Sequence, residues 1–322
     1  MYILDESVLQ PGDIVLTTQD RKVSKGIRRL TGSTFSHAIL YVARGGYIHS
    51  DVNGVQSNNT QRLLFSGPGH ALALRLARET DKKKIQLICD YARAQVGTQY
   101  SVSEAIASRK KRGAAVGLRS NRQFCSRLVA QSYAYGGVAL VPNPDYCYPT
   151  DLYKVDLVAH VPKCLRVATA AEIEFANTPS PLEVQAQATN YVLEGVRKAS
   201  GEDVQTEEQV VQLLLRRPDL DEASSRCLME SGYLELWRME VTANPWRYED
   251  DAFGSANPPP EIRAEEISSA EDLLRRFTIM RTQFSALGKR RTLKYFALKR
   301  DLYERLIAQQ VKRRQLMRGG DA

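Results

Sequence analysis

One cysteine lies where a sulfur nucleophile could be activated. Cys125 stands in residues 124–130, whose apolar members begin the buried face of a predicted helix. Ser120 and Asn121, just upstream, are residue types that cap helix N-termini. The Cys125 sulfur would therefore lie near the positive end of a helix dipole, which stabilises a thiolate. The alternative interpretation is a small buried apolar side chain. That is the role we expect of the other cysteines, which are Cys89, Cys147, Cys164 and Cys227.

A thiol that attacks a carbonyl needs a base, and two upstream histidines could supply it. His37 lies in a predicted strand at residues 35–42, and His49 lies in the next predicted strand. If the two strands form a hairpin, one imidazole can take the thiol proton while the second fixes its tautomer. Asp51 is an alternative orienting group, because alternation puts it on the same strand face as His49. A histidine within a strand is more often an ordinary core residue. Two of them followed by a cysteine at a helix start predict a catalytic set of Cys125, His37 and His49.

The chemistry of these residue types is acyl transfer through a thioester. We expect His37 to take the Cys125 proton and form a thiolate–imidazolium pair. The thiolate attacks an acyl carbonyl, and the backbone N–H of Cys125 stabilises the oxyanion. Gln123 and Tyr100 are both candidates for a second oxyanion donor, and the sequence does not choose between them. Water or another acceptor then takes the acyl group.

Short strands separated by turn signals dominate residues 1–168. Helical periodicity in this half is confined to residues 81–96 and to the stretch that begins at Cys125 and stops at Gly136. Residues 108–119 are predicted to form a polar loop beside the active cleft. This half is therefore predicted to be an α+β domain with an antiparallel sheet. Its strands are expected at residues 9–17, 35–42, 47–51, 71–77 and about 155–167.

From residue 169 to residue 322 the periodicity is helical almost throughout, and strand signals disappear. Capping boxes at Thr206 and Ser268 open two of the predicted helices. Residues 244–261 hold three consecutive prolines and are predicted to be a loop or linker. The second half, 169–322, is therefore predicted to be an all-helical C-terminal domain. Its helices are expected at residues 181–199, 206–217, 222–240, 268–287 and 289–318.

Further short motifs surround the candidate residues. Gly97-Thr98-Gln99-Tyr100 precedes the cysteine helix, Pro149-Thr150-Asp151-Leu152 follows it, and Pro11-Gly12-Asp13 opens the first strand. With the histidine strands ahead of the cysteine helix, this order resembles the circularly permuted branch of the NlpC-type, papain-like cysteine hydrolases. A histidine as the third member of the catalytic set is similar to the lecithin:retinol acyltransferase-like members of this branch. Those members have a typical Asn-Cys-Glu-His run, whereas this chain has Phe124-Cys125-Ser126-Arg127 around its cysteine. The resemblance covers roughly residues 5–165.

The resemblance implies a permuted papain-like domain and a cysteine hydrolase. Permuted members are associated with acyl-lipid chemistry, so the first hypothesis is a lipid acyl hydrolase or acyltransferase acting on membrane phospholipid esters. Such an enzyme could serve as an antibacterial toxin, whose expected partner is an inhibitor or immunity protein. The alternative is a thiol amidase or endopeptidase that cuts peptide bonds such as those of peptidoglycan. A third hypothesis is a binding module without activity, against which the intact Cys125, His37 and His49 argue.

The chain of 322 residues carries a net charge of +8, and much of the excess lies between residues 289 and 318. Basic residues near an anionic membrane contribute on the order of 1 kcal/mol each. We therefore expect contact with anionic lipid headgroups, the alternative being an ordinary packed helix with a solvated basic face. Nucleic acid is not an expected partner, because few aromatic residues are interleaved with these charges. The residues of this basic segment are Lys289, Arg290, Arg291, Lys294, Lys299 and Arg300.

Several protein classes are disfavoured by composition. No stretch reaches the roughly 18 consecutive apolar residues of a membrane span. The five cysteines lack the close spacing of a disulfide framework or a zinc site, so neither a metal nor another cofactor is expected. The first residues have neither the basic start nor the apolar run of a secretory signal. We therefore expect a cytoplasmic protein, or one exported by a machine that needs no signal peptide.

Overall fold

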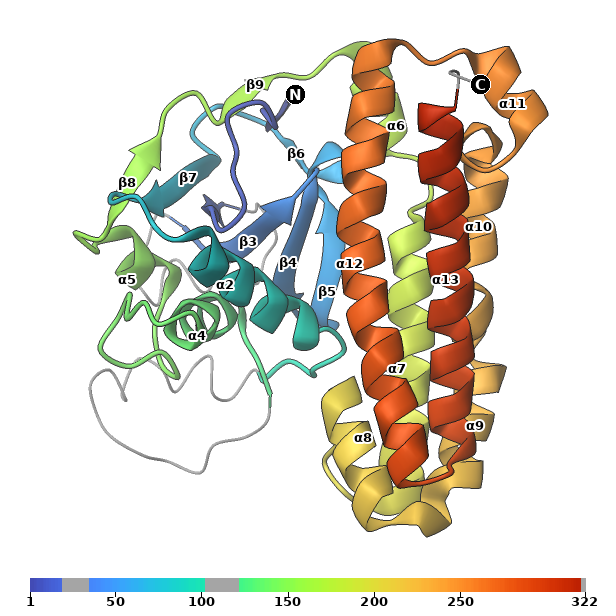
Figure 1. The fold of residues 1–322 in the computed structure, drawn as a ribbon. Helices are drawn as coiled ribbons and strands as arrows, with labels where there is room; N and C mark the ends of the chain where they lie inside the picture. The colour runs from blue at the N-terminus through green and yellow to red at the C-terminus, as the bar shows by residue number, and fades with distance from the viewer. Residues whose placement is uncertain (19–34, 102–121, 320–322) are drawn as a thin grey trace. The chain divides into compact units, whose positions relative to one another are not determined.

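The computed structural model describes residues 1–18, 35–101 and 122–319. The chain divides into two compact units (Figure 1). The first contains Met1–Leu182 and Asp203–Glu208, and the second contains Glu183–Glu202 and Gln209–Ala322. The predicted loop at residues 108–119 and the predicted capping residues Ser120 and Asn121 lie outside the described residues. None of the helices in the described ranges is both long enough and apolar enough to cross a lipid bilayer.

The first unit is built on two antiparallel sheets. The larger sheet has six strands in the order β5-β4-β3-β2-β7-β8, so that neighbours along the chain are mostly neighbours in space. Its strands are β2 (Ile14–Thr17), β3 (His37–Ala43), β4 (Gly46–Asp51), β5 (Gly54–Asn59), β7 (Ala71–Leu76) and β8 (Val158–Val161). The smaller sheet has the order β6-β1-β9, with β6 at Leu64–Phe65, β1 at Tyr2–Leu4 and β9 at Leu165–Val167.

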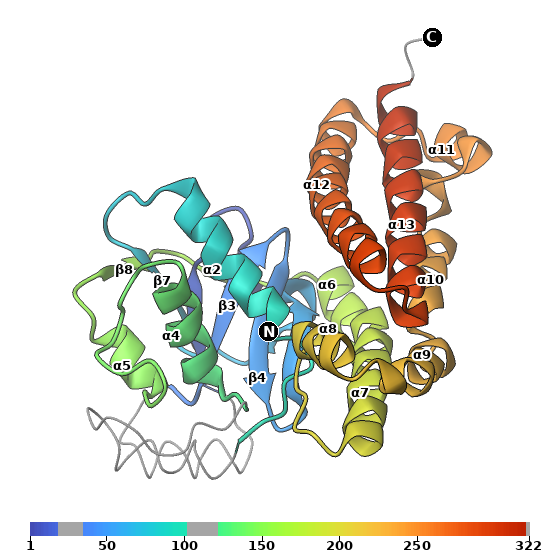
Figure 2. The same ribbon diagram turned by 60° about the horizontal axis from the view of Figure 1, so that its bottom comes forward.

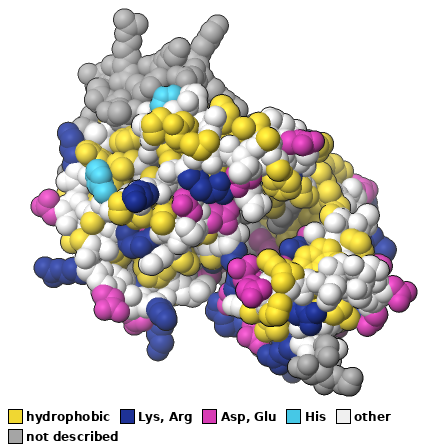
Figure 3. Space-filling view, turned by 90° about the horizontal axis from the view of Figure 1, so that it is seen from above, with side chains coloured by type: hydrophobic (Ala, Val, Ile, Leu, Met, Phe, Trp, Pro, Cys, Tyr) yellow, Lys and Arg dark blue, Asp and Glu magenta, His cyan; other side chains and the backbone are white. Residues whose placement is uncertain are grey.

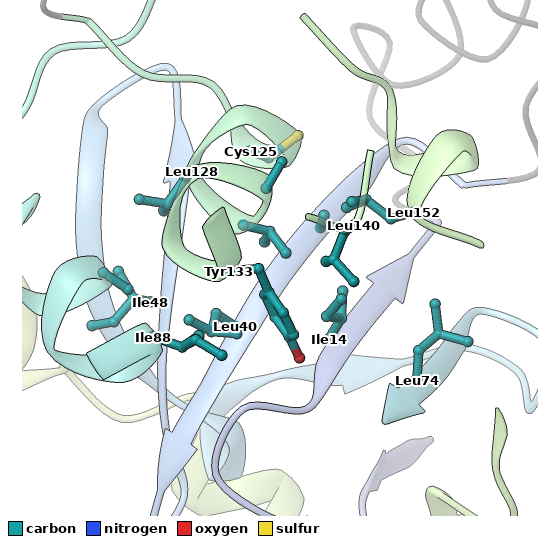
Figure 4. Close-up of a cluster of buried hydrophobic side chains, with 14 of the residues drawn as sticks. Ile14, Leu40, Ile48, Leu74, Ile88, Cys125, Leu128, Tyr133, Leu140 and Leu152 are labelled. Carbon is teal, nitrogen blue, oxygen red and sulfur yellow. The ribbon is translucent and has the colours of Figure 1, made fainter. Parts of the chain in front are cut away.

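Helices α2 (Lys82–Ala94) and α4 (Cys125–Tyr135) lie on one side of the larger sheet (Figure 1, Figure 2). The central strand β3 is apolar on both faces, as a strand covered on both sides must be. Its Ala38 and Leu40 pack against the two helices, and its Ile39 and Tyr41 join a second core with the smaller sheet. Helix α4 contributes Leu128, Val129, Ala130 and Tyr133 to the first core (Figure 4). The sheet, α2 and α4 thus form one packed body that fixes where α4 begins.

The second unit is helical, as predicted. The structure therefore confirms the predicted fold class, an α+β domain with antiparallel sheets followed by a helical C-terminal region. The chain enters this region through α6 (Ala170–Ala176), which belongs to the first unit and packs against the turn η1 (Thr60–Arg62). The later helices are α7 (Pro181–Ser200), α8 (Glu207–Arg216), α9 (Asp221–Glu230), α10 (Trp237–Ala243), α11 (Asp250–Ala256), α12 (Pro260–Arg290) and α13 (Lys294–Arg318).

Two helix boundaries differ from the predicted ones, and each difference has a local cause. Helix α12 begins at Pro260 rather than at Ser268, because proline at the first helical position has a suitable φ and needs no N–H partner. The last helix begins at Lys294 rather than at residue 289. The carboxylate of Asp221 accepts hydrogen bonds from the backbone N–H groups of Lys294 (2.7 Å) and Tyr295 (3.0 Å), and so caps α13 from another helix. The predicted loop at residues 244–261 contains the short helix α11.

Candidate active site

The two candidate histidines are cross-strand neighbours in the β3–β4 hairpin. Ile39 pairs with His49, so alternation puts His37 on the same sheet face as His49. The Nε2 atom of His37 lies 3.0 Å from Nδ1 of His49, and the two rings are nearly perpendicular with centroids 5.2 Å apart. The structure thereby confirms that the two imidazoles meet, as the hairpin prediction required.

Asn58 continues this series of contacts, and the sequence analysis missed it. Its Nδ2 lies 2.9 Å from Nε2 of His49. For Nδ1 of His37 to accept a proton, Nε2 of His37 must carry the ring proton and donate it to Nδ1 of His49. Nε2 of His49 is then protonated and donates to the side-chain oxygen of Asn58, which takes the place of Nδ2 when the amide turns over. Nδ1 of His37 is then the nitrogen left to work with a thiol. The signal for Asn58 was present in the Asn53-Gly54 turn, whose register places Asn58 opposite Tyr47 and on the face of His49.

Asp51, the alternative orienting group, is used by the turn. Its Oδ1 accepts the backbone N–H of Asn53 at 2.8 Å and so closes the β4–β5 connection. Its charge raises the pKa of His37, but burial and the neighbouring His49, which lower it, have the larger effects. His49 therefore makes the direct hydrogen bond to His37, and Asp51 acts on that ring only at longer range.

Cys125 is the first residue of α4, as predicted. The preceding Phe124 is extended, with φ −142° and ψ 163°, and gives the helix no side-chain cap. The Cys125 side chain is 8% exposed, and its sulfur points away from Leu128 and Tyr133 (Figure 4). Hydrogen bonding from the backbone N–H groups of Ala38 and Ser126 lowers the pKa of this thiol. Because Ala38 directly follows His37, the sulfur lies at the start of β3, one residue along the strand from the proposed base.

The electrostatics of the resting site differ from the expected ion pair. Burial raises the pKa of Cys125 more than the hydrogen bonds from Ala38, from Ser126 and from its own backbone N–H lower it. Burial and the adjacent His49 lower the pKa of His37 to about 3, and burial lowers that of His49 to about 4. At neutral pH the free site therefore holds a thiol and two neutral imidazoles, because loss of hydration disfavours all three charged forms. The thiolate must form during the reaction.

A neutral resting pair predicts how alkylation of Cys125 depends on pH. Because the pKa of the thiol is raised, its thiolate fraction should grow about tenfold per unit from about pH 5 to about pH 8. We expect the rate of reaction with iodoacetamide to follow that slope. Mass spectrometry of the peptide that contains residue 125 measures it, with the Cys125→Ala variant as the blank. A rate that stays constant across this range would instead indicate a thiolate–imidazolium pair at rest.

Of the two candidate oxyanion donors, Tyr100 fits better than Gln123. The Gln123 Nε2 group donates to Oε1 of Gln131 (2.7 Å) and of Gln95 (3.4 Å), so both of its N–H bonds have partners. Tyr100 forms an isolated parallel bridge with Gln123, which brings its backbone beside the entry to α4. Burial raises the pKa of Tyr100, and the nearby Cys125 and Asp51 raise it further. The phenol therefore stays protonated and can donate a hydrogen bond.

Arg127, the basic residue nearest the thiol in sequence, has a structural role. It is 2% exposed, and its guanidinium lies 4.9 Å from the centroid of the Phe124 ring and 5.2 Å from that of Tyr146. It donates hydrogen bonds to the backbone carbonyls of Asp145 (2.8 Å) and Arg122 (2.9 Å). Arg127 thus ties together the chain before and after α4.

Three of the six residues in the basic segment have partners within the second unit. Lys294 and Arg300 form ion pairs with Glu222 and Asp301. Lys299 is 1% exposed, and its ammonium group lies 4.4 Å from the ring centroid of Tyr233, in the range of a cation–π contact. On the face seen in Figure 3, Lys and Arg side chains are interspersed with Asp and Glu. Three members of the predicted set, Lys289, Arg290 and Arg291, lie together at the end of α12 and are exposed.

Metal ligands do not cluster in the part of the chain that the structure describes. Within those ranges, no group of three or more His, Cys, Asp or Glu side chains lies close enough together to hold a metal ion. The two ring nitrogens that approach each other, in His37 and His49, are occupied by their mutual hydrogen bond. The five cysteines are unpaired thiols.

Comparisons with known proteins concern the unit that holds this site. Residues 8–154 match the model of a family described as "Permuted papain-like amidase enzyme, YaeF/YiiX, C92 family". A crystal structure described as metalloprotein YiiX from Escherichia coli O157:H7 aligns with a TM-score of 0.37 and 18% identity, covering 47% of this chain and 96% of that chain. No curated protein gave a match. The family match confirms the resemblance to permuted papain-like cysteine hydrolases for residues 8–154 and supports a cysteine hydrolase type of activity.

Proposed function

We propose that the first unit is a cysteine amidase that cleaves a peptide-type amide bond through a thioester on Cys125. One observation carries the proposal most. The hydrogen-bonded series of Asn58, His49 and His37 ends at the residue before Ala38, whose backbone N–H lowers the pKa of the Cys125 thiol. The base and its orienting groups are thus consecutive along one line of contacts, and the nucleophile is linked to the residue that follows the base in β3. Thiol hydrolases require these three roles in one site. The description of the matched family as amidases supports the choice of an amide.

The reaction follows from the neutral resting site. As the Cys125 sulfur attacks the carbonyl carbon, its proton passes to Nδ1 of His37, and the carbonyl oxygen becomes an oxyanion. The backbone N–H of Cys125 and the Tyr100 hydroxyl donate to that oxygen. The His37 imidazolium then gives its proton to the leaving amine, and a thioester remains. Water, deprotonated by His37, attacks the thioester, and the acid product leaves while the thiol is restored.

Each supporting group has a defined task in this scheme. The hydrogen bond from Nε2 of His37 to Nδ1 of His49 keeps the ring proton of His37 on Nε2, so that Nδ1 is unprotonated and can accept the thiol proton. Asn58 in turn accepts the Nε2–H of His49 through its side-chain oxygen, and so leaves Nδ1 of His49 as the acceptor for His37. Cys125 lies in the first turn of α4, so the positive end of the helix dipole also stabilises the thiolate as it forms.

The substrate class is tested by product analysis on two matched panels. We expect the protein to release new amino termini from peptidoglycan fragments or short peptide amides, and the Cys125→Ala variant to release none. Phospholipid vesicles containing phosphatidylglycerol form the second panel, with free fatty acid as the product. Release of fatty acid without new amino termini would replace the amidase by a lipid acyl hydrolase.

Lipid acyl-ester hydrolysis is therefore the second candidate, and one observation favours it. Lys289, Arg290 and Arg291 form an exposed basic cluster on the second unit, at the end of α12. Such a cluster can bind anionic headgroups. The same thioester chemistry would then act on an ester, since the leaving group changes from an amine to an alcohol. Reversing the three charges to glutamate should abolish vesicle binding in this case and leave amide cleavage unchanged.

A further inference from the structure

A short segment beyond the matched residues is hydrogen-bonded to the loop that carries Tyr100. The chain leaves the first unit after Leu182, forms most of α7, and returns to the first unit with Asp203–Glu208. Gln205 in this returning segment is 0% exposed. Its Oε1 accepts the backbone N–H of Gln99 at 2.8 Å, and its Nε2 donates to Oε1 of Gln99 at 3.2 Å. Gln205 therefore makes two hydrogen bonds to the same residue, Gln99.

Gln99 connects Gln205 to the entry of the cysteine helix. The carbonyl of Gln99 accepts the backbone N–H of Gln123 at 2.9 Å, and the carbonyl of Gln123 accepts that of Ser101 at 3.0 Å. These two bonds enclose Tyr100, and Gln123 stands two residues before Cys125. A displacement of Gln99 would therefore move both the candidate oxyanion donor and the start of α4.

The other side of this loop is fixed by β5, and Gln205 supplies a further restraint at Gln99. The backbone N–H of Val55 donates to the carbonyl of Thr98 (2.8 Å), and that of Gly97 donates to the carbonyl of Val55 (2.9 Å). Gly54 lies so close that an added Cβ would be 2.5 Å from the Thr98 oxygen. Residues 97 and 98 are thus held by the sheet, while the N–H of Gln99 is held by Gln205.

We propose that Gln205 is a positioning residue, which holds Gln99 and thereby sets Tyr100 and Cys125 in their catalytic geometry. This rests on the proposed function of the Cys125 site. It gives a residue beyond the matched residues 8–154 a part in catalysis, since Gln205 lies in the segment between α7 and α8 that belongs to the first unit. Oxyanion stabilisation demands donor positions fixed within a fraction of an ångström, so small movements of the loop slow the chemical step.

The test compares Gln205→Ala with Gln212→Ala, which truncates an exposed glutamine on α8. We expect Gln205→Ala to lower kcat by about tenfold to a hundredfold while KM changes by less than about threefold. Amide hydrogen exchange in the peptide covering residues 97–101 should accelerate in the same variant. Gln212→Ala should match the wild type in both measurements. All assays are run well below the melting temperature of each full-length variant.

A variant with reversed polarity, in which residues 203 and 205 exchange their carboxylate and amide groups, separates a positioning role from a general loss of stability. Nε2 of Gln205 also donates to Oδ1 of Asp203 at 2.5 Å, so Gln205→Glu alone brings two carboxylates together. Adding Asp203→Asn supplies an amide donor in place of the lost one, and the carboxylate introduced at position 205 can still accept the Gln99 N–H. We expect this double variant to recover most of the kcat that Gln205→Ala loses.

The outcomes distinguish this inference from the proposed function. If Gln205→Ala has the kcat of the wild type, or if its amide exchange at residues 97–101 is unchanged, the positioning role is overturned. The amidase proposal is then still supported as long as the Cys125→Ala variant is inactive. Wild-type activity in Cys125→Ala overturns the amidase itself, whatever Gln205 does. A polarity-reversed variant as slow as Gln205→Ala also contradicts the inference.

Discussion

Replacing Cys125 by alanine is expected to lower kcat by about 10⁴-fold or more, with the fold intact. The sulfur is the atom that forms the thioester, so no other group in the site can carry the reaction when it is absent. The side chain is small, and it lies at the first turn of α4 rather than deep in the helix interface. We therefore expect a stability loss of only about 1 kcal/mol, as for most single substitutions.

The matched control for this variant is Cys89→Ala. Cys89 is 2% exposed and lies in the same hydrophobic core on α2, but it has no part in the proposed chemistry. Its replacement should leave kcat within a few-fold of the wild type. Circular dichroism and thermal unfolding check that both variants are folded. Activity that survives Cys125→Ala, or disappears equally in Cys89→Ala, would contradict the role given to the sulfur.

The second large effect is expected at His37. His37→Gln should lower kcat by about 10²- to 10⁴-fold, because it removes the group that takes the thiol proton and later returns it to the amine. His49→Asn should cost less, since His37 remains but its tautomer is no longer fixed. Asn58→Ala should cost least, because it acts on His37 only through His49.

The order of these three effects is the measurement that matters. Steady-state kcat is determined for each variant, and the expected ranking of losses is His37, then His49, then Asn58. Exposed His160 on β8 provides the control, and His160→Gln should behave as the wild type. A larger loss for Asn58→Ala than for His37→Gln would reverse the series and contradict the assignment of His37 as the base.

The parts of the site that depend on local periodicity were predictable from the sequence. Strand alternation and one hairpin were enough to bring His37 and His49 together, and the apolar pattern after Cys125 was enough to place it at a helix start. Asn58 required the register of β5 as well, because an asparagine near a strand end is usually a solvent-exposed residue. The distinction between Tyr100 and Gln123 required the partners of the Gln123 amide, which come from two other helical segments.

The protonation state of the site could not be predicted in this way. A helix start favours a thiolate, whereas burial favours a thiol, and only the three-dimensional packing decides which effect is larger. In this protein burial dominates for Cys125 and for both histidines. The sequence conveys the types of the groups but not the loss of water around them.

The helical half illustrates the same limit. Lys299 was predicted to face an anionic surface because it lies in a basic run, yet the rings of Tyr233 and Phe284 come from other elements and surround it. The start of α13 likewise depends on Asp221, far away in sequence. Helix content was predictable from periodicity, whereas burial of a charge and capping by a remote carboxylate are tertiary effects.

Mass spectrometry of the acyl-enzyme tests the central claim most directly. The wild-type protein is mixed with a peptide amide or peptidoglycan fragment, quenched in acid within one turnover, and digested. We predict that the peptide containing Cys125 gains the mass of the acyl group, that hydroxylamine removes it, and that His37→Gln greatly reduces its formation. Product formation with Cys125 unmodified, or with the acyl group on another residue, would contradict the thioester mechanism.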